Sequence, residues 1–364
     1  MKLASAHAAA LAAVSLLAGT GASAQSSSVH LYGQLGAAVN YTTNQGSQGN
    51  STLTVSNHLL SPSMFGIRGT EDLGNGMAAV FRLEADVKTD TGVAGAGNRL
   101  FNRQAFVGLN LNPSVTVTLG RQLHAHADRL LETQDVYHTA GTSAHTVPFA
   151  LYGNRYSSLD SRVDSSIKLR ARGPAGFSGG ASYGFSSGED KSYSLQFGRD
   201  VAAYSIGGWY VNQRGANPIT GTTRYPDQTM WGIGGSMPVG PVRLYMLYAD
   251  VHIDGTQAAQ RTQSNRLMSV GASWQPSPSW TLKANYVLDR GRSLNGVAGR
   301  DGRKNTLVAS VDYALSRRTS LNLTVFENRY ADGYKLEALN IALLNRDPTA
   351  SSTRGISVGM RHAF

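Results

Sequence analysis

The sequence contains no cysteine among its 364 residues. This excludes disulfide scaffolds, thiol nucleophiles and thiolate metal sites together. After residue 24 it also lacks any run of about 18 apolar residues, which excludes helical membrane spans. Compact blocks of Leu, Ile and Val are scarce as well, although 41% of the residues are hydrophobic. Apolar residues spread so thinly favour a sheet with two different faces over a dense globular core.

Charge of either sign is not concentrated in any part of the chain. The 33 basic and 23 acidic residues give a formal net charge of +10. The basic residues are spread out and form no cluster interleaved with aromatic residues. Nucleic acid is therefore excluded as a partner.

The first 24 residues have the pattern of a secretory signal peptide. Lys2 supplies a positive start, residues 8–18 supply an apolar stretch, and residues 22–24 (ASA) supply a small-residue cleavage site. We therefore expect an exported protein with a signal peptide at residues 1–24 and one folded domain at residues 25–364.

The feature that recurs along the rest of the chain is alternation. In WTLKANYVLD (280–289), Trp280 and Tyr286 fall on one face and Lys283 and Asn285 on the other. Each such segment predicts a strand with one apolar and one polar face. Three more segments alternate in this way, namely 163–171 (with Val163 and Ile167 on the apolar face), 305–315 and 319–325.

Short connections and long polar stretches separate the alternating segments in turn. Gly, Pro, Asn and Asp dominate the short ones, as tight hairpin turns require. With one strand before the first short turn and one after the last, seven such turns predict sixteen strands. The short connections lie at 71–76, 110–115, 172–177, 199–204, 237–242, 275–280 and 314–320.

An even strand count, with short turns at one end and long loops at the other, predicts an all-β fold: a transmembrane 16-stranded antiparallel β-barrel. Lipid cannot hydrogen-bond an open strand edge, so the first strand must pair with the last. The final residues, GISVGMRHAF (355–364), alternate and have no turn after them, so we expect them to be the closing strand. A secreted β-sandwich also alternates, but it rarely has sixteen strands with long loops on one side only.

One interval between short turns is longer than the others. Its surplus lies between GRQ (120–122) and NRYSSLD (154–160). A loop of this length is usually functional, and the aqueous lumen of a sixteen-stranded barrel is wide enough to hold it. We therefore expect the loop to fold inward; a surface loop exposed outside the cell is the alternative.

Several motifs, taken in order, resemble the general porins of Gram-negative outer membranes, particularly the β-proteobacterial type. The resemblance covers the whole chain after residue 24, and it implies a homotrimer of sixteen-stranded barrels whose third loop folds inward and narrows the pore. It also implies outer-membrane lipid, lipopolysaccharide and the barrel-assembly machinery as partners, with Phe364 as the signal that this machinery reads. The motifs are SSVHLYGQLGAAV (27–39), MFGIRGTEDLGNGMAAVFRLE (64–84), LFNRQAFVGL (100–109), VTLGRQ (117–122) and GMRHAF (359–364).

Function in such a barrel is electrostatic and steric. Carboxylates on an inward loop, opposite guanidinium groups on the wall, set a transverse field across the water in the pore. By resemblance, Arg103 and Arg155 occupy wall-arginine positions, and Arg121 and Arg68 are weaker candidates nearer a rim. An Arg facing lipid at the bilayer midplane costs about 2–4 kcal/mol, which favours the inward direction.

Two wall positions depart from the family pattern. Met64 stands where relatives often carry a further Arg, and Gln34 stands where some carry Lys. Two unit charges 4 Å apart interact by about 1 kcal/mol in water and by about 4 kcal/mol at an effective dielectric near 20. Because basic groups are lost at these positions, we expect only a mild preference for anions.

The stretch HADRLLETQD (126–135) supplies the expected acidic residues of the inward loop, Asp128, Glu132 and Asp135. It also predicts a short helical turn with Asp128 and Glu132 on one side. A charged but merely solvated loop surface is the alternative interpretation.

Four histidines, His124, His126, His138 and His145, lie in the same loop. They lack the third-ligand spacing of a metal site, so no metal and no cofactor is expected. Their ordinary titration near pH 6.5 would make conductance depend on pH.

The function that these observations favour is passive diffusion of small hydrophilic solutes and ions across the outer membrane. Two alternatives are an outer-membrane barrel enzyme (a lipase or protease) and a surface adhesin or receptor. The sequence has no GxSxG nucleophile elbow and no Ser/His pair with informative spacing, so we expect no enzymatic activity.

Overall fold

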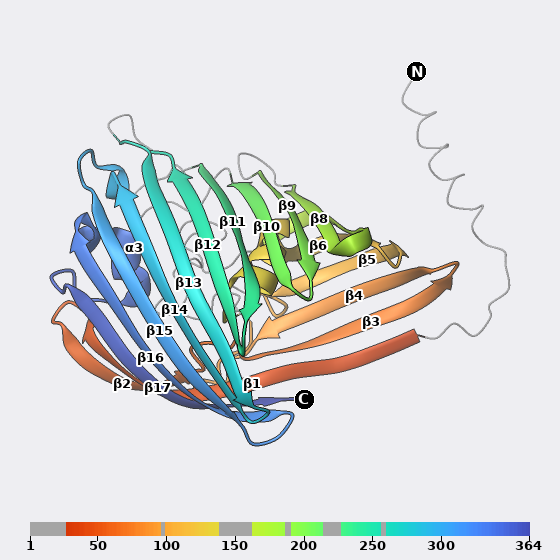
Figure 1. Cartoon of the computed structure of the whole chain (residues 1–364), viewed down its shortest axis with the longest axis horizontal. Helices are drawn as coiled ribbons and strands as arrows, with labels where there is room; N and C mark the ends of the chain where they lie inside the picture. The colour runs from red at the N-terminus through yellow and green to blue at the C-terminus, as the bar shows by residue number, and fades with distance from the viewer. Residues whose placement is uncertain (1–26, 96–98, 138–161, 186–190, 214–226, 256–259) are drawn as a thin grey trace.

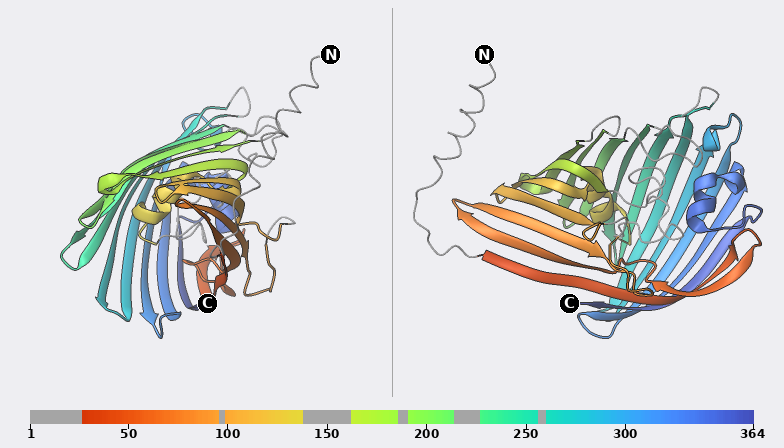
Figure 2. Two further views of the ribbon diagram at one scale, coloured as in Figure 1. Left: turned by 90° about the vertical axis from the view of Figure 1, so that its right-hand side faces the viewer. Right: turned by 180° about the vertical axis from the view of Figure 1, so that it is seen from behind.

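The computed structural model describes residues 27–95, 99–137, 162–185, 191–213, 227–255 and 260–364. They form one antiparallel sheet that closes on itself as a barrel (Figure 1, Figure 2). The strands are β1 (Ser27–Gln45), β2 (Asn50–Asn57), β3 (Met64–Gly74), β4 (Met77–Asp86), β5 (Gln104–Asn112), β6 (Val115–Leu123), β7 (Arg162–Arg172), β8 (Phe177–Gly184), β9 (Ser192–Val201), β10 (Tyr204–Gln213), β11 (Gln228–Val239), β12 (Val242–Ile253), β13 (Gln263–Ser277), β14 (Trp280–Arg292), β15 (Gly302–Ala314), β16 (Thr319–Asp332) and β17 (Ser352–Ala363).

The helical elements are short. Among the described residues, no helix has the length and apolarity needed to cross a bilayer. The elements are α2 (Ala125–Arg129), the π-helical turn η2 (Leu130–Gln134), the 3-10 turns η4 (Pro174–Gly176), η5 (Leu294–Gly296) and η6 (Gly333–Leu336), and α3 (Ala338–Leu344).

The 17 strands fill sixteen positions in the wall. β1 pairs with β3 through residues 27–34 and with β2 through residues 37–45, so β2 and β3 share one side of β1. Between β2 and β3, residues 58–63 leave the wall. There the Ser63 hydroxyl satisfies the backbone of Gly36, accepting from its N–H and donating to its C=O, both at 2.9 Å. The predicted sixteen-stranded barrel is confirmed.

The last strand closes the barrel, as its alternation predicts. β17 pairs with β1 from Gln34↔Ala363 to Thr42↔Gly355. Beyond this ladder, the Phe364 N–H donates to the Gly33 carbonyl at 3.0 Å, and the Gly33 N–H donates back at 3.2 Å. A Cβ at residue 33 would lie 2.6 Å from the Phe364 ring, so this junction needs a glycine.

Exposure along the strands is the reverse of that in a water-soluble protein. Outward apolar side chains are exposed, such as Leu307 (47%) and Val358 (58%), whereas inward polar side chains such as Thr306 and Ser357 are each 1% exposed. Such a surface fits hydrocarbon outside and polar groups inside. The apolar and polar faces predicted for residues 305–315 are therefore confirmed, and the alternation of the closing strand has the same two faces.

The predicted facing of Val163 was wrong. A bulge between β6 and β7 shifts the register between Gly120 and Gln122, and Ser165 takes a left-handed conformation (φ 46°). The extra residue moves Val163 off the face that carries Ile167, and Val163 is buried. Alternation alone could not show the bulge.

All seven predicted short turns join the strands that they were expected to join. Beside two of these turns, the rings of Trp280 and Tyr313 pack in a tilted arrangement with their centroids 4.7 Å apart, and both side chains point outward and are exposed. Trp274 is exposed beside the same turn. This grouping fits an aromatic girdle at the membrane interface.

Two loops enter the barrel. The loop after β6 carries α2 and η2, and the loop after β16 carries η6 and α3 (Figure 1). The second loop is fixed by polar contacts: Lys304 Nζ donates to Asn340 Oδ1 at 2.7 Å, and the Arg346 guanidinium donates to the Tyr334 carbonyl at 2.6 Å. All four of these residues are almost fully buried.

Candidate functional site

The candidate site is the polar lumen where the loop after β6 meets the barrel wall. At the end of β6 the chain turns inward, and α2 lies against β7, β8, β9 and β10. The Ala125 N–H donates to Ser182 Oγ at 3.0 Å, and the His126 N–H donates to Ser194 Oγ at 2.8 Å. These wall serines satisfy N–H groups that the first turn of a helix leaves without partners. The inward fold and the helical turn predicted here are confirmed for residues 124–137; the rest of the loop lies outside the described residues.

Arg129 fixes the loop to β9 and β10. Its guanidinium donates to both carboxylate oxygens of Asp200, at 2.7 and 2.9 Å, and to the Ile206 carbonyl at 2.7 Å. The side chain lies across two glycines, because a Cβ at Gly198 or Gly207 would be 2.1 or 2.4 Å from its atoms. The two glycines are paired in register and thus make a slot for Arg129.

Further along, the loop is held by Gln134 and Tyr137. Gln134 Nε2 donates to the carbonyls of Gly207 (2.8 Å) and Gly234 (3.0 Å), and Trp209 Nε1 donates to Gln134 Oε1 at 2.8 Å. Tyr137 Oη lies 3.2 Å from the Val308 carbonyl. The described part of the loop therefore runs along the inner wall from β7 to β15.

An apolar cluster inside the lumen joins this loop to the segment that leaves the wall between β2 and β3. Its members are Leu60 from that segment, Val136 and Tyr137 from the loop, and Tyr245, Val308 and Phe326 from the wall.

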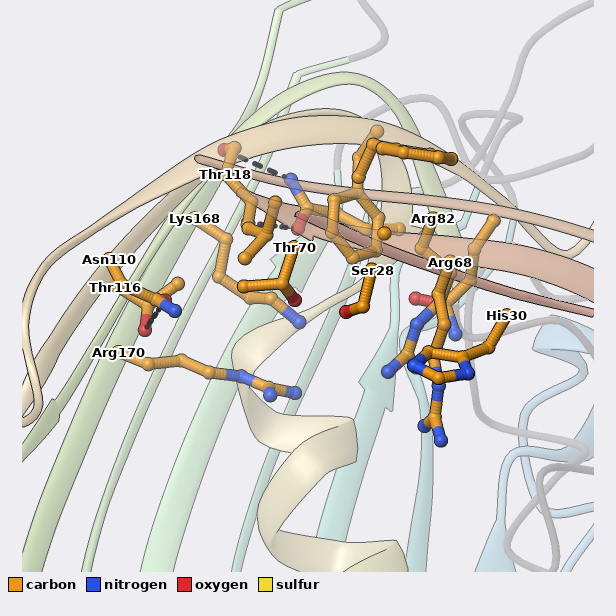
Figure 3. Close-up of a pocket in the computed structure, with 16 residues that line it drawn as sticks. Ser28, His30, Arg68, Thr70, Arg82, Asn110, Thr116, Thr118, Lys168 and Arg170 are labelled. Carbon is orange, nitrogen blue, oxygen red and sulfur yellow. Dashed lines mark hydrogen bonds between the residues drawn. The ribbon is translucent and has the colours of Figure 1, made fainter. Parts of the chain in front are cut away.

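Beside α2 lies a cavity of about 470 Å³ with a basic lining. Figure 3 shows Arg68 and Arg82 on one side of it and Lys168 and Arg170 on the other. Hydroxyl and amide groups complete the polar surface, including those of Ser28, Thr70, Gln104, Asn110, Thr116, Thr118 and Gln122.

One loop carboxylate faces two of these cations. Asp128 accepts from Lys168 Nζ at 3.1 Å and from Arg170 Nε at 2.7 Å. Asp128 and Lys168 are 7% and 5% exposed, whereas the Arg170 side chain is 46% exposed. Two cations share one anion, so the group keeps a positive charge that faces water through Arg170.

A second carboxylate lies on the wall. Glu84 accepts from Tyr32 Oη and Gln104 Nε2, both at 2.6 Å, and lies 3.9 Å from Arg82. The Arg68 guanidinium stacks over the Tyr32 ring, 4.9 Å from its centroid. Four basic side chains thus stand against two carboxylates around the cavity.

The predicted wall arginines fall in different places. Arg68 lines the cavity. Arg103 is buried and donates to Asp86 Oδ1 at 2.7 Å, while Arg121 donates to Asp164 Oδ1 at 2.7 Å and to the Asn102 carbonyl at 2.6 Å. Neither Arg103 nor Arg121 is among the cavity-lining residues. Arg155 lies outside the described residues.

The two wall positions that depart from the family pattern lie opposite each other. Gln34 and Met64 are register partners of β1 and β3. Gln34 Nε2 donates to Ser61 Oγ (2.9 Å) and to the Pro62 carbonyl (2.7 Å). Gln34 therefore anchors the segment that leaves the wall.

The other predicted loop carboxylates have distinct surroundings. Glu132 lines a smaller cavity of about 150 Å³ together with Asp128, Arg170 and Arg172. Asp135 Oδ1 accepts the Tyr137 N–H at 3.0 Å. Asp128 and Glu132 share one side of the helical segment, as their spacing predicts.

Two histidines of the loop, His124 and His126, are not placed to titrate near neutrality. His124 and His126 are 0% and 1% exposed, and each ring Nδ1 lies within 3.2 Å of a wall serine hydroxyl. Burial lowers the pKa of His126 to about 3 and holds the pKa of His124 well below its usual range. The pH dependence expected from these two residues was therefore wrong. His138 and His145 lie outside the described residues.

Sequence reasoning missed three of the four Lys and Arg residues that line the cavity, Arg82, Lys168 and Arg170. The signal was present, since the alternation of 163–171 places Lys168 and Arg170 on the polar face of their strand. What it could not give was the position of Asp128 between them. Among the described residues, no group of three or more His, Asp or Glu side chains is arranged to hold a metal ion.

Comparison with known proteins gives concordant results. A family described as Gram-negative porin matches residues 8–333. Outer membrane porin protein 32 of Delftia acidovorans is 28% identical and covers 97% of this chain and 99% of its own length. An outer membrane porin protein of Bordetella pertussis is 26% identical with the same coverage.

Solved structures agree on the fold. The anion-selective porin from Comamonas acidovorans superimposes with a TM-score of 0.76 at 22% identity, covering 93% of this chain and 100% of its own. The trimer form of OmpT, an outer membrane protein of Vibrio cholerae, has a TM-score of 0.68 at 15% identity, covering 93% of this chain and 100% of its own.

Proposed function

The chain belongs to the Gram-negative porin family, and on this premise we propose that ions and small hydrophilic solutes diffuse through its barrel with a mild preference for anions. It is a porin of the cell outer membrane that forms a water-filled channel. The single observation that carries the anion preference is the cavity beside α2, where Arg68, Arg82, Lys168 and Arg170 outnumber Glu84 and Asp128.

The electrostatics of a narrow pore supports a preference for anions. Wall groups in a narrow aqueous pore act at short range, and an excess of one sign raises the local concentration of the opposite ion. The salt links of Arg103 and Arg121 to Asp86 and Asp164 neutralise part of the wall, which keeps the preference mild. The structure with the highest similarity reported above is described as anion-selective.

The experiment is conductance in a planar bilayer, with the reversal potential measured in a KCl gradient. We expect stepwise conductance and a reversal potential of the sign for Cl⁻. The variant Arg68→Gln with Arg82→Gln should move the reversal potential toward zero. Absence of conductance steps would overturn the channel itself, whereas an unmoved reversal potential would overturn only the role of the cavity.

We further propose that the chain assembles as a homotrimer, as the name of the OmpT trimer form suggests. Conductance steps should then come in multiples of three. We also propose that residues 1–24 are removed on export, that Phe364 is read by the barrel-assembly machinery, and that lipopolysaccharide is a lipid partner. The relatives are porins, and we propose that this chain has no enzymatic activity.

A further inference from the structure

Arginines border the outer apolar face of the barrel at its long-loop end. On five consecutive strands, β13 to β17, an outward face of mainly apolar side chains is followed by an exposed arginine toward the loops, with Asn305 before the arginine of β15 and Glu327 before that of β16. On β14, for example, Trp280, Ala284 and Tyr286 precede Arg290 on the same face. We call this set the arginine belt: Arg266 on β13, Arg290 and Arg292 on β14, Arg303 on β15, Arg329 on β16 and Arg354 on β17.

Three arginines of the belt stand directly opposite one another. Arg266 is the register partner of Arg290, and Arg290 is the register partner of Arg303. Directly opposite residues have Cβ atoms about 4.5–5.5 Å apart, and like charges in such positions repel. A row of three guanidinium groups on adjacent strands is therefore unfavourable unless an anion lies over it.

The protein itself places few carboxylates beside the arginine belt. Asp250 lies 3.4 Å from Arg266 but also 2.9 Å from His252. Glu327 is shared by Arg329 and Arg354, at 2.9 and 2.6 Å. Within the described part of the chain, Arg290, Arg292 and Arg303 have no ion pair, so six cations of the belt are served by two carboxylates.

The level of the belt identifies the anion. Below the belt and the adjoining Asn305 and Glu327, the outward side chains of these strands are apolar as far as the short-turn end. At the short-turn end the outward positions carry Trp274, Trp280 and Tyr313. The belt thus lies where the hydrocarbon ends on the long-loop side, at the height of lipid headgroups. A guanidinium group binds phosphate oxygens in a two-pronged fashion, and a row of them fits a headgroup that carries more than one phosphate.

We propose that the arginine belt is a binding site for the phosphates of lipopolysaccharide in the leaflet that the long loops face. The inference rests on the outer-membrane placement under the proposed function, and it does not depend on ion selectivity. It commits to a lipid headgroup; free phosphate and a second copy of this chain are the competing occupants.

The test uses the full chain in nanodiscs and lipid A that carries both phosphates, with binding measured by native mass spectrometry. The triple variant Arg266→Gln, Arg290→Gln, Arg303→Gln should bind lipid A at least about tenfold more weakly, since each arginine near an anionic surface contributes roughly fivefold. The control Arg317→Gln with Arg318→Gln, at a short turn of the same wall, should bind as the parent does. Dephosphorylated lipid A should bind the parent and the triple variant equally.

Three outcomes would overturn the proposal. Equal binding of lipid A by parent and triple variant would remove the belt from lipid recognition. Displacement of lipid A by millimolar inorganic phosphate would assign the row to a free anion. Loss of the oligomer in the triple variant would assign it to contacts between copies of the chain. Conductance steps of the triple variant, expected to match those of the parent, keep this test separate from that of the channel.

Discussion

Arg129 and Asp200 join the inward loop to the barrel wall through two parallel hydrogen bonds of 2.7 and 2.9 Å. The arginine side chain is 3% exposed and the aspartate 41%. A charged hydrogen bond of this kind contributes about 1.5–3 kcal/mol, and the water around Asp200 places it toward the lower end. Arg129 lies in the glycine slot, so this pair is one of the contacts that fix the position of the loop.

We expect Asp200→Asn to loosen the inward loop without unfolding the barrel. The Arg129 guanidinium keeps its hydrogen bond to the Ile206 carbonyl but loses its ion pair with the Asp200 carboxylate. The loop is then held less firmly against an applied voltage. Single-channel recordings should show noisier open currents and closure at a lower voltage than in the parent. Arg199→Gln, one residue earlier on the same strand, is the matched control; equal behaviour of both variants would remove the clamp role.

Filling the glycine slot gives an independent test of the same clamp. A Cβ at Gly207 would lie 2.4 Å from Arg129 Nε and equally close to the Phe197 carbonyl oxygen. Gly207→Ala should therefore displace Arg129 and reproduce the noisy currents of Asp200→Asn. Gly179→Ala on β8, the strand on the other side of β9, should leave the recordings unchanged, because a Cβ there meets nothing closer than 3.8 Å.

Asp128 controls how much positive charge the cavity presents. Replacing it with Asn leaves Lys168 and Arg170 without their carboxylate. One unit charge at about 4–10 Å changes the energy of an ion in water by about 1–0.4 kcal/mol, with opposite sign for Cl⁻ and K⁺. The Cl⁻ over K⁺ permeability ratio should therefore rise roughly four- to thirtyfold. Reversal potentials in a KCl gradient measure the ratio, with Thr133→Ala in the same helical segment as control. A fall in the ratio would contradict the assignment.

Arg68 and Arg103 should respond oppositely to the same substitution. Arg68 faces the cavity, whereas Arg103 is buried against Asp86. We expect Arg68→Ala to lower anion preference with little loss of stability. Arg103→Ala should instead lower the thermal stability of the protein, because it leaves Asp86 without its cation, while the reversal potential moves little. If Arg103→Ala lowers the anion preference and Arg68→Ala instead lowers the thermal stability, then Arg103 is the residue that faces the ions.

The architecture could be predicted from the sequence because short-range sequence patterns determine where its strands and turns lie. Strand alternation, seven turn signals and the unfinished terminal strand each follow from the requirements of a closed sheet in lipid. The split between β2 and β3 could not be read in this way. It depends on Ser63 replacing a strand partner of Gly36, a contact between distant residues that no local pattern reports.

The site was predictable in kind and less so in detail. Asp128 was identified as a loop carboxylate, but its neutralisation by Lys168 and Arg170 depends on the path of the loop along the wall. Arg103 was identified by its motif, and the motif does not show that Asp86 pairs with it. Charges in a pore act through their partners, and the partners come from other strands.

The buried His124 and His126 make the pH response of the described part of the inward loop predictable. Both have pKa values in the folded protein below the ordinary value near 6.5, so they stay neutral between pH 5 and 8 and should leave conductance flat in that range. Below pH 6.5 the unfolded loop binds protons that the packed loop does not. The packing free energy therefore falls by up to about 1.4 kcal/mol per pH unit for each histidine, and for His126 the loss continues down to about pH 3.

Recordings from pH 8 to pH 4 should show steady currents to about pH 5 and growing noise below it. In His124→Asn with His126→Asn the acid noise should not grow with falling pH, and a parent conductance that titrates between pH 6 and 7 would mean that other groups in the pore set the response.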